Sequence, residues 1–354
     1  MKKMFLFAAM ASIAFASCTT DEKVFDGTDE SNEIRFTAAQ YSAQSRAGEH
    51  APGVEFTSPV AIWAWLDGTN ESVIAGDNYD PVNKKFSSGE NTKYYWPVDD
   101  GMVDFVSIPS SMLGTSYFSG PTRTAAGVTT LTFKINGEVY HNTNLMTTQV
   151  LTGNRETGTV ALLFRHLLAK IKINVTQKER NNEDARWTVK INSINVNGLH
   201  NTGTVTINDE WTAENGGNDC NWGTTSGSET WTVAGVHQLY ADGSAGASAT
   251  PFASAEPYYL LPQALATGVQ TITIDYTVVT DYLGNETQPN TVENYSKTFN
   301  LFDATSIKAW NMNKNIVYNI AIDPSETLTP ITFTVKEEEW GGSEEGTPDV
   351  DPIP

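Results

Sequence analysis

Cysteine is scarce in this chain, whose 354 residues contain two, Cys18 and Cys220. Cys18 directly follows a candidate secretory leader. If it is lipidated there, Cys220 has no partner within the chain. No internal disulfide is then available, so packing alone must hold the fold.

Basic residues are also few, with 22 Lys and Arg against 42 Asp and Glu and a net charge of −20. A surface with this excess of negative charge repels phosphate groups. Nucleic acid is therefore excluded as an expected partner, and an anionic membrane surface is disfavoured for the same reason.

Long apolar runs are missing after the first 18 residues, since no later stretch approaches the roughly 20 residues that a membrane span needs. Residues 1–18 place two lysines before the run MFLFAAMASIAFA and small residues before Cys18. This order predicts a signal peptide. Its Ala-Ser-Cys ending resembles a lipoprotein box and predicts lipidation at Cys18. The alternative is an ordinary secretory signal with an incidental cysteine.

Recognisable catalytic and metal-binding patterns are missing as well. The five histidines form no HExxH motif and no Cys/His pairing at zinc spacing. Neither a GxSxG motif nor a Gly-rich phosphate loop occurs. The sequence therefore predicts a protein that is not an enzyme and that uses no cofactor and no metal.

Three polar features have a second, chemical interpretation that we consider weaker. His166 lies inside a predicted strand and is expected to be an interior histidine rather than a ligand. Asp99 and Asp100 are expected to form a turn rather than the acid pair of a glycosidase. Cys220, in GGNDCNWG, is expected to lie in a loop. We expect that this cysteine is not a nucleophile and that its loop does not bind calcium.

What the chain does contain is strand-forming sequence, with 10% aromatic residues and many Thr, Val and Ile. Alternating segments are separated by Gly, Asn and Asp clusters, and no long stretch has helical periodicity. In one segment Trp63 and Trp65 share a face, and Ile62, Ala64 and Leu66 share the other. The pattern predicts an all-β fold of two β-sandwiches, with a loop set or insertion over residues 208–250.

The segment at residues 144–175 organises the rest of the prediction. From Ala169 to Val175 it alternates cleanly, whereas residues 160–168 are apolar on nearly every side chain. We expect one strand that is covered on both faces in its first half and on one face in its second. Such a strand is expected to open a second domain that lies against the first.

Several ordered motifs resemble the fimbrillin-like proteins, the subunits of type V pili. The first motifs are the lipoprotein box at Cys18, the dipeptide Arg46-Ala47, and YYWP at 94–97 followed by VDFVSIP. The later ones are NLMTTQV, FRHLLAKIKINV, YYLLPQ at 258–263, WNMNKNIVYNIAI at 310–322 and FTVKEEEW. The resemblance spans nearly the whole mature chain.

This resemblance implies two transthyretin-like β-sandwiches in tandem. It places a signal peptide at 1–18, a tether and propeptide strand at 19–46, sandwiches at 47–157 and 158–340 with a terminal strand at 331–340, and an acidic tail at 341–354. It also implies a lipoprotein of the outer membrane and cell surface, carried in a fimbrium.

The resemblance further implies maturation and strand exchange. A trypsin-like protease would cut between Arg46 and Ala47 and release the first strand, residues 33–40. A neighbouring subunit would then insert its terminal strand into the vacated groove, in a head-to-tail polymer. Ile34, Phe36 and Ala38 would be the released groove fillers, and Ile331, Phe333 and Val335 the donor side chains.

Two alternatives remain open at this stage. Beyond Trp340 the chain departs from major shaft subunits, so a tip or accessory subunit that accepts a strand without donating one is possible. The other class is a surface lipoprotein that does not polymerise and binds carbohydrate through exposed aromatics. Its candidate platform consists of Trp211, Trp222 and Trp231, which are otherwise expected to be buried loop anchors.

Overall fold

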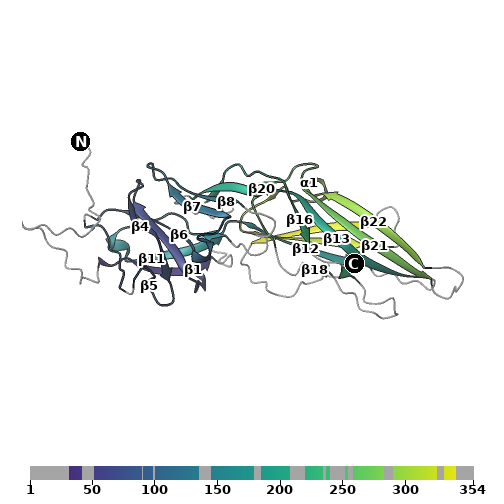
Figure 1. The fold of residues 1–354 in the computed structure, drawn as a ribbon, viewed down its shortest axis with the longest axis horizontal. Coiled ribbons are helices and arrows are strands. Elements are labelled where there is room, and N and C mark those ends of the chain that lie inside the picture. The colour runs from purple at the N-terminus through teal and green to yellow at the C-terminus, as the bar shows by residue number, and fades with distance from the viewer. Residues whose placement is uncertain are drawn as a thin grey trace, which may run out of the picture.

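A computed structural model describes residues 32–41, 52–89, 91–98, 100–134, 145–178, 185–207, 220–233, 237–239, 252–253, 258–282, 290–324 and 331–339. Its regular structure is almost entirely β, which confirms the predicted all-β class. The chain folds into an elongated molecule (Figure 1), in which the earliest strands lie at one end and the latest toward the other. Among the described residues no helix is long and apolar enough to cross a membrane.

Two sheets pack face to face at the N-terminal end of the molecule. The first has the order β2 (Pro52–Glu55), β1 (Arg35–Tyr41), β11 (Thr159–His166), β9 (Met146–Thr147). The second has the order β10 (Leu151–Gly153), β6 (Val103–Pro109), β3 (Val60–Leu66), β4 (Ser72–Asp80), β5 (Lys85–Phe86). Alternate side chains from both sheets build one hydrophobic core between them, which we call the N-terminal core.

A third sheet covers the outer face of β3 and β6. Its order is β15 (Cys220–Trp222), β14 (Thr202–Ile207), β8 (Thr129–Lys134), β7 (Phe118–Arg123). Because β6 is covered on both faces, all seven of its residues are buried. In β3, Trp63 and Trp65 belong to the core on this side, and Ile62, Ala64 and Leu66 to the N-terminal core. The predicted division of this strand into two faces is therefore confirmed.

Two larger sheets form the C-terminal end. One has the order β18 (Phe252–Ala253), β12 (Ala169–Gln177), β24 (Lys314–Ile322), β25 (Ile331–Glu339), with β19 (Tyr258–Leu260) also on β12. The other has the order β16 (Glu229–Val233), β13 (Ala185–Leu199), β21 (Thr271–Tyr282), β22 (Thr291–Asn300), with β17 (His237–Gln238) also on β13. Buried and outward side chains alternate along β12 and β24, and the inner faces of the two sheets share one core with the third sheet, which we call the C-terminal core.

The remaining elements are short. β20 (Gln263–Ala264) pairs with β23 (Ala309–Trp310), and α1 (Leu301–Ala304) follows β22. Two 3₁₀ turns cover residues Ser110–Met112 and Arg155–Thr157.

The single strand predicted over residues 160–175 is wrong, because this segment forms two strands in two different sheets. β11 pairs with β1 and β9, whereas β12 pairs with β24, β18 and β19. Leu167 and Leu168 between the two strands are buried. The apolar run therefore continues across the junction, and the sequence pattern shows no break where one strand ends and the next begins. The first half is also not covered on both faces, since Ala161 is exposed.

The loop set predicted over residues 208–250 is wrong in part, because β15, β16 and β17 lie within it. β15 extends the third sheet, and β16 and β17 extend a C-terminal sheet. The division into tandem domains at 47–157 and 158–340 stays a prediction. β14 pairs with β8 and β11 pairs with β9 across that boundary, and β11 also pairs with β1 of the 19–46 segment.

Candidate functional site

The first strand that the structure describes, β1, lies in the middle of a sheet, between β2 and β11. It runs parallel to β11, with Arg35 opposite Thr159 and Gln40 opposite Phe164. On its other side β1 is antiparallel to β2, with Ala39 opposite Glu55. The sheet thus joins residue 35 to residue 159 across most of the N-terminal half of the sequence.

One face of this first segment is almost completely buried. Ile34 is 3%, Phe36 3% and Ala38 7% exposed, whereas Arg35 and Thr37 are exposed. All three inward side chains belong to the N-terminal core. Burying a large aliphatic or aromatic side chain in this way contributes about 1.5–3 kcal/mol. The residues predicted to share a face therefore fill a groove, whose described walls include Ile62, Ile74, Phe105, Val160, Leu162 and Phe164.

Phe36 stands at the centre of an aromatic cluster. Its ring centroid lies 5.5 Å from that of Tyr79, 5.7 Å from Phe105 and 6.0 Å from Phe86, each in an edge-on arrangement. Edge-to-face pairs at these separations add about 0.5–1.5 kcal/mol each beyond the buried area. The groove is therefore shaped for an aromatic ring at this position.

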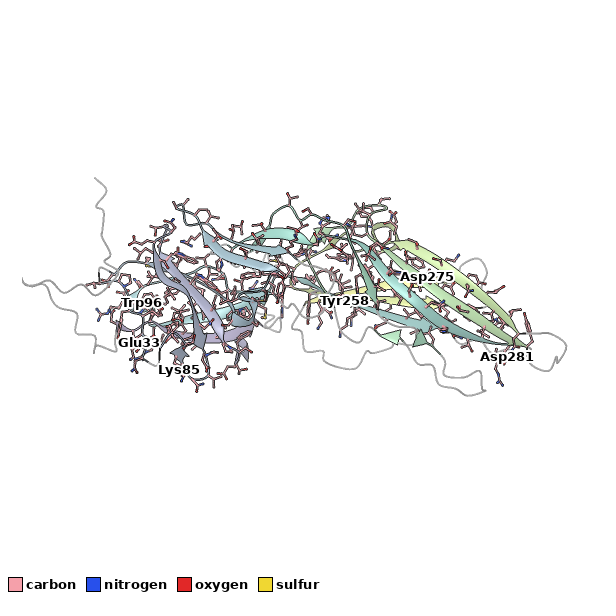
Figure 2. All side chains as sticks on the ribbon, in the orientation of Figure 1. Glu33, Lys85, Trp96, Tyr258, Asp275 and Asp281 are labelled. Atoms are coloured by element: carbon pink, nitrogen blue, oxygen red, sulfur yellow. The ribbon has the colours of Figure 1, made fainter. Side chains whose placement is uncertain are left out.

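Hydrogen bonds tie the start of the segment to the YYWP motif. The Ile34 N–H donates to the Tyr94 carbonyl at 2.8 Å, and the Trp96 N–H donates to the Asn32 carbonyl at 3.1 Å. Lys93 forms a 3.0 Å ion pair with Glu33. Figure 2 shows Glu33 and Trp96 together at the end of the molecule opposite Asp281. The YYWP motif thus shapes one end of the groove.

Two further hydrogen bonds fasten the carbonyls of β1. The Tyr79 hydroxyl donates to the Phe36 carbonyl at 3.1 Å, and the Phe56 N–H donates to the Ala38 carbonyl at 3.1 Å. Burial raises the pKa of Tyr79, with smaller contributions from the charges of Asp80 and Glu33, so the hydroxyl keeps its proton. Sequence reasoning missed Tyr79, since a tyrosine in an alternating strand gives no sign of what its hydroxyl reaches.

The last described strand, β25, lies at the edge of its sheet. All nine of its residues pair antiparallel with β24, from Ile331 opposite Ile322 to Glu339 opposite Lys314. Ile331, Phe333 and Val335 are half-buried against the C-terminal core, and Thr332 and Thr334 are exposed. The Phe333 ring lies 5.5 Å from the rings of both Phe299 and Tyr318.

β25 is an additional strand outside a pair of parallel strands that resembles a pair at the other end of the molecule. At the N-terminal end β1 pairs parallel with β11, and at the C-terminal end β12 pairs parallel with β24. In each case an early strand lies beside a later strand that runs in the same direction. β25 is added outside the β12–β24 pair, and β24 is its one neighbour among the strands that the structure describes.

Three predicted site residues lie outside the described residues: Cys18, Arg46 and Ala47. Lipidation and cleavage therefore stay predictions. Arg46 falls between β1, which ends at Tyr41, and β2, which begins at Pro52. A cut there would separate the two strands in sequence while leaving β2 attached to the rest of the chain.

The other polar candidates have no arrangement that favours chemistry. Within the described ranges no group of three or more His, Cys, Asp or Glu side chains could hold a metal ion. His166 is 3% exposed, and burial, followed by the charge of Lys170, lowers its pKa to about 3. Asp100 has φ 52°, which fits a turn; Asp99 lies outside the described residues.

The proposed carbohydrate platform is also not formed by the described tryptophans. Trp231 is 3% exposed and belongs to the C-terminal core. Trp222 is half-buried, and its indole N–H donates to the Leu167 carbonyl at 3.0 Å. Trp211 lies outside the described residues.

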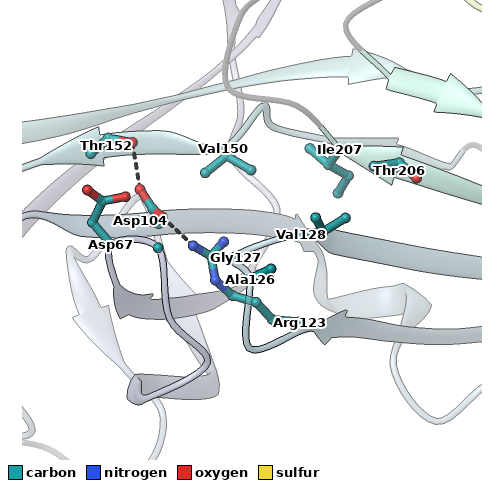
Figure 3. A pocket seen from close by; sticks show the side chains of 11 residues that line it. Asp67, Asp104, Arg123, Ala126, Gly127, Val128, Val150, Thr152, Thr206 and Ile207 are labelled. Carbon is teal, nitrogen blue, oxygen red and sulfur yellow. Dashed lines mark hydrogen bonds and ion pairs between the residues drawn. The ribbon is translucent and has the colours of Figure 1, made fainter.

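A pocket of about 310 Å³ lies between the second and third sheets (Figure 3) and contains a buried ion pair. Arg123 of β7 donates to Asp104 of β6, to the Thr69 carbonyl at 2.6 Å and to the Thr129 hydroxyl at 3.0 Å. Asp104 also accepts from the Thr152 hydroxyl at 2.6 Å. Burial, followed by the charge of Asp104, raises the pKa of Asp67 at the rim. This pair was not predicted from the sequence, although an aspartate within the apolar VDFVSIP was a signal for it.

Comparisons with known proteins agree with this architecture. The family model described as fimbrillin-like matches residues 46–340. A fimbrial protein from Bacteroides vulgatus is similar in structure, with a TM-score of 0.54 and 16% identity over 87% of this chain and 100% of that one. A protein from Bacteroides uniformis that is assigned to cell adhesion has a TM-score of 0.46 and 17% identity over 87% and 98%. No curated protein matches the chain.

Proposed function

The chain belongs to the fimbrillin-like family, and we propose that it is a pilus subunit that matures by loss of β1 and assembles by strand exchange. The non-enzymatic character and the pilus-type adhesion role follow from the family. The finer steps are the proposal: export as a lipoprotein through Cys18, cleavage between Arg46 and Ala47, and polymerisation on the cell surface.

The observation that carries this proposal is the burial of the first segment's apolar face in the middle of a sheet. Release of β1 would leave residues 159–164 of β11 without a neighbour among the described strands, because β9 pairs further along, at Arg165 and His166. It would also uncover the aromatic cluster around Phe36. An open sheet edge beside an apolar groove is a template for another chain's strand.

β25 is the best donor among the described strands. It has one neighbour in its sheet, and its apolar side chains are only half-buried there. In the groove, the corresponding positions of β1 are at most 7% exposed. Transfer to another subunit would therefore exchange one set of backbone pairs for another and bury more apolar surface, which favours the exchange.

Such an exchange joins unlike surfaces, a groove on one subunit and a terminal strand on the next. A contact of this kind does not close on itself and propagates a filament. The proposed partners are other fimbrillin subunits, a trypsin-like protease and the outer membrane through the lipid. A tip or accessory subunit, which accepts a strand and retains its own β25, is the second form of the proposal.

Limited proteolysis of the precursor tests the proposal. Residues 19–354, a chain that lacks Cys18, are treated with a trypsin-like protease, and the products are read by N-terminal sequencing and on an unheated detergent gel. We expect a stable core that begins at Ala47 and a ladder of polymers. Arg46→Ala is the matched control and should stay an uncut monomer.

The other outcomes separate the alternatives. A core that begins at Ala47 and stays monomeric would favour the tip or accessory form. Absence of a discrete cut near Arg46 would remove the maturation mechanism and leave the family assignment standing. A ladder formed by Arg46→Ala would show that polymerisation does not need the cut.

A further inference from the structure

The strand predicted to leave the groove and the strand predicted to enter it have similar sequences. Residues 34–38 read Ile-Arg-Phe-Thr-Ala and residues 331–335 read Ile-Thr-Phe-Thr-Val. Both place Ile, Phe and a small aliphatic residue on one face, with an exposed Thr between the last two. We infer that a partner copy's β25 occupies the groove in the direction and register of β1, with Ile331 replacing Ile34, Phe333 replacing Phe36 and Val335 replacing Ala38. This inference rests on the proposed function and adds the geometry of the joint.

The aromatic cluster determines which residue of β25 lies at its centre. Tyr79, Phe86 and Phe105 surround the Phe36 ring edge-on, so the vacated space has the shape of a phenyl ring. A shift of two residues toward one end would put Phe333 at Ala38 and overfill that site. The opposite shift would put Val335 at Phe36 and leave a cavity between the three rings. Only the unshifted register matches large with large and small with small.

The direction of β25 follows from the proline that precedes it. In the parallel arrangement Pro330 takes the position of Glu33. The two described backbone hydrogen bonds to the YYWP segment use the Ile34 N–H and the Asn32 carbonyl, and neither uses the Glu33 N–H. A proline at this place keeps both bonds available.

In the reverse arrangement, with Phe333 still in the cluster, Pro330 falls at Ala39. That residue pairs with Leu163 on one side and Glu55 on the other. A proline has no N–H to offer either strand and is excluded from the interior of a sheet. The donor strand therefore runs parallel to β11, as β1 does.

The outward faces are consistent with this register. Thr334 would take the place of Thr37, and both are exposed in their present strands. Thr37 lies opposite Ala161 of β11, which is also exposed. Thr334 of one subunit and Ala161 of its neighbour, both solvent-accessible, must therefore lie side by side.

Cysteine cross-linking between subunits tests the register. The acceptor change is Ala161→Cys, in the precursor of residues 19–354 that also carries Cys220→Ser to remove the background thiol. The donor change is Thr334→Cys, and matched variants carry Thr332→Cys or Lys336→Cys instead. Each precursor is cut, allowed to assemble and oxidised, and then boiled and run on a non-reducing gel.

The expected result is a covalent ladder with Thr334→Cys and its loss with the other two variants. A disulfide requires Cα atoms closer than about 7 Å, and residues displaced by two along a neighbouring strand exceed that distance. The uncut Thr334→Cys precursor should give no ladder, since its β25 lies on its own β24.

Failure of the register and failure of the proposed function give different results. A covalent ladder from Thr332→Cys or Lys336→Cys would mean a reversed or shifted strand and would overturn the inference while pilus assembly stands. An unheated ladder without any covalent product would point to another donor segment and would also overturn it. Absence of an unheated ladder from a cut chain without the new cysteines would overturn the inference and the polymerising form of the proposed function, and would leave its tip or accessory form.

Discussion

At the scale of single residues, Phe36 concentrates the interactions that hold the first strand. It is 3% exposed, it contacts three aromatic rings, and its carbonyl accepts from the Tyr79 hydroxyl. Its neighbour Thr37 is exposed. The stability of the precursor should therefore depend strongly on residue 36 and weakly on residue 37.

Phe36→Ala should lower the free energy of unfolding of the precursor by about 3–5 kcal/mol, because it removes a buried ring and leaves a cavity among three others. Urea denaturation of residues 19–354 measures this loss. Thr37→Ala is the control and should change the value by less than about 0.5 kcal/mol. Equal effects from the two substitutions would contradict the burial of Phe36.

At the scale of elements, β1 and β25 differ in their place in the sheet and in how deeply their apolar faces are buried. β1 lies between two strands, whereas β25 lies at a sheet edge with its apolar face half-buried. The strand with the more buried face is the one that proteolysis is proposed to release, and the less buried strand is the proposed replacement. Cleavage is required in this scheme because β1 would otherwise keep the groove at high effective concentration.

Phe333→Asp should abolish the polymer ladder of the cut chain, because a carboxylate would have to enter the aromatic cluster without a partner, at a cost of several kcal/mol. The unheated detergent gel measures assembly, and the melting temperature of the precursor measures the loss within its own domain. Thr332→Asp, on the exposed face of the same strand, is the matched control and should still assemble. Normal ladders from Phe333→Asp would exclude β25 as the donor.

At the scale of the whole molecule, the third sheet connects the two ends. It combines β7 and β8 with β14 and β15, which are separated by the strands from β9 to β13. The Arg123–Asp104 ion pair fastens this sheet to β6, with both side chains at most 5% exposed. In the proposed filament, a tensile force along its length would be transmitted through this contact between the third sheet and β6. The rigidity of the contact therefore matters for the proposed function.

Asp104→Asn should lower the free energy of unfolding by about 3–5 kcal/mol, because it leaves the Arg123 charge buried without its counter-ion. Asp67→Asn, at the exposed rim of the same pocket, is the control and should not lower the free energy of unfolding, because it removes a charge that Asp104 repels. Chemical denaturation compares the two. A loss below about 1 kcal/mol for Asp104→Asn would mean that the hydroxyl and carbonyl partners of Arg123 are sufficient.

Local patterns in the sequence determined the all-β class and which side chains of a strand share a face. They identified the common face of Ile34, Phe36 and Ala38 and the two faces of the Trp63–Trp65 segment, because a strand's side chains alternate with a period of two whatever its partner. The same rule predicted that Ile331, Phe333 and Val335 share a face.

Only the tertiary structure decided which strands pair, and in which direction. It placed β1 beside β11, divided residues 159–177 between two sheets, and joined β8 to β14. Alternation is the same for parallel and antiparallel strands, and a buried junction such as Leu167-Leu168 leaves no break in the pattern. In these three pairs the contacts join residues 68 to 145 positions apart and compete across the whole chain, and a short sequence window contains no record of that competition.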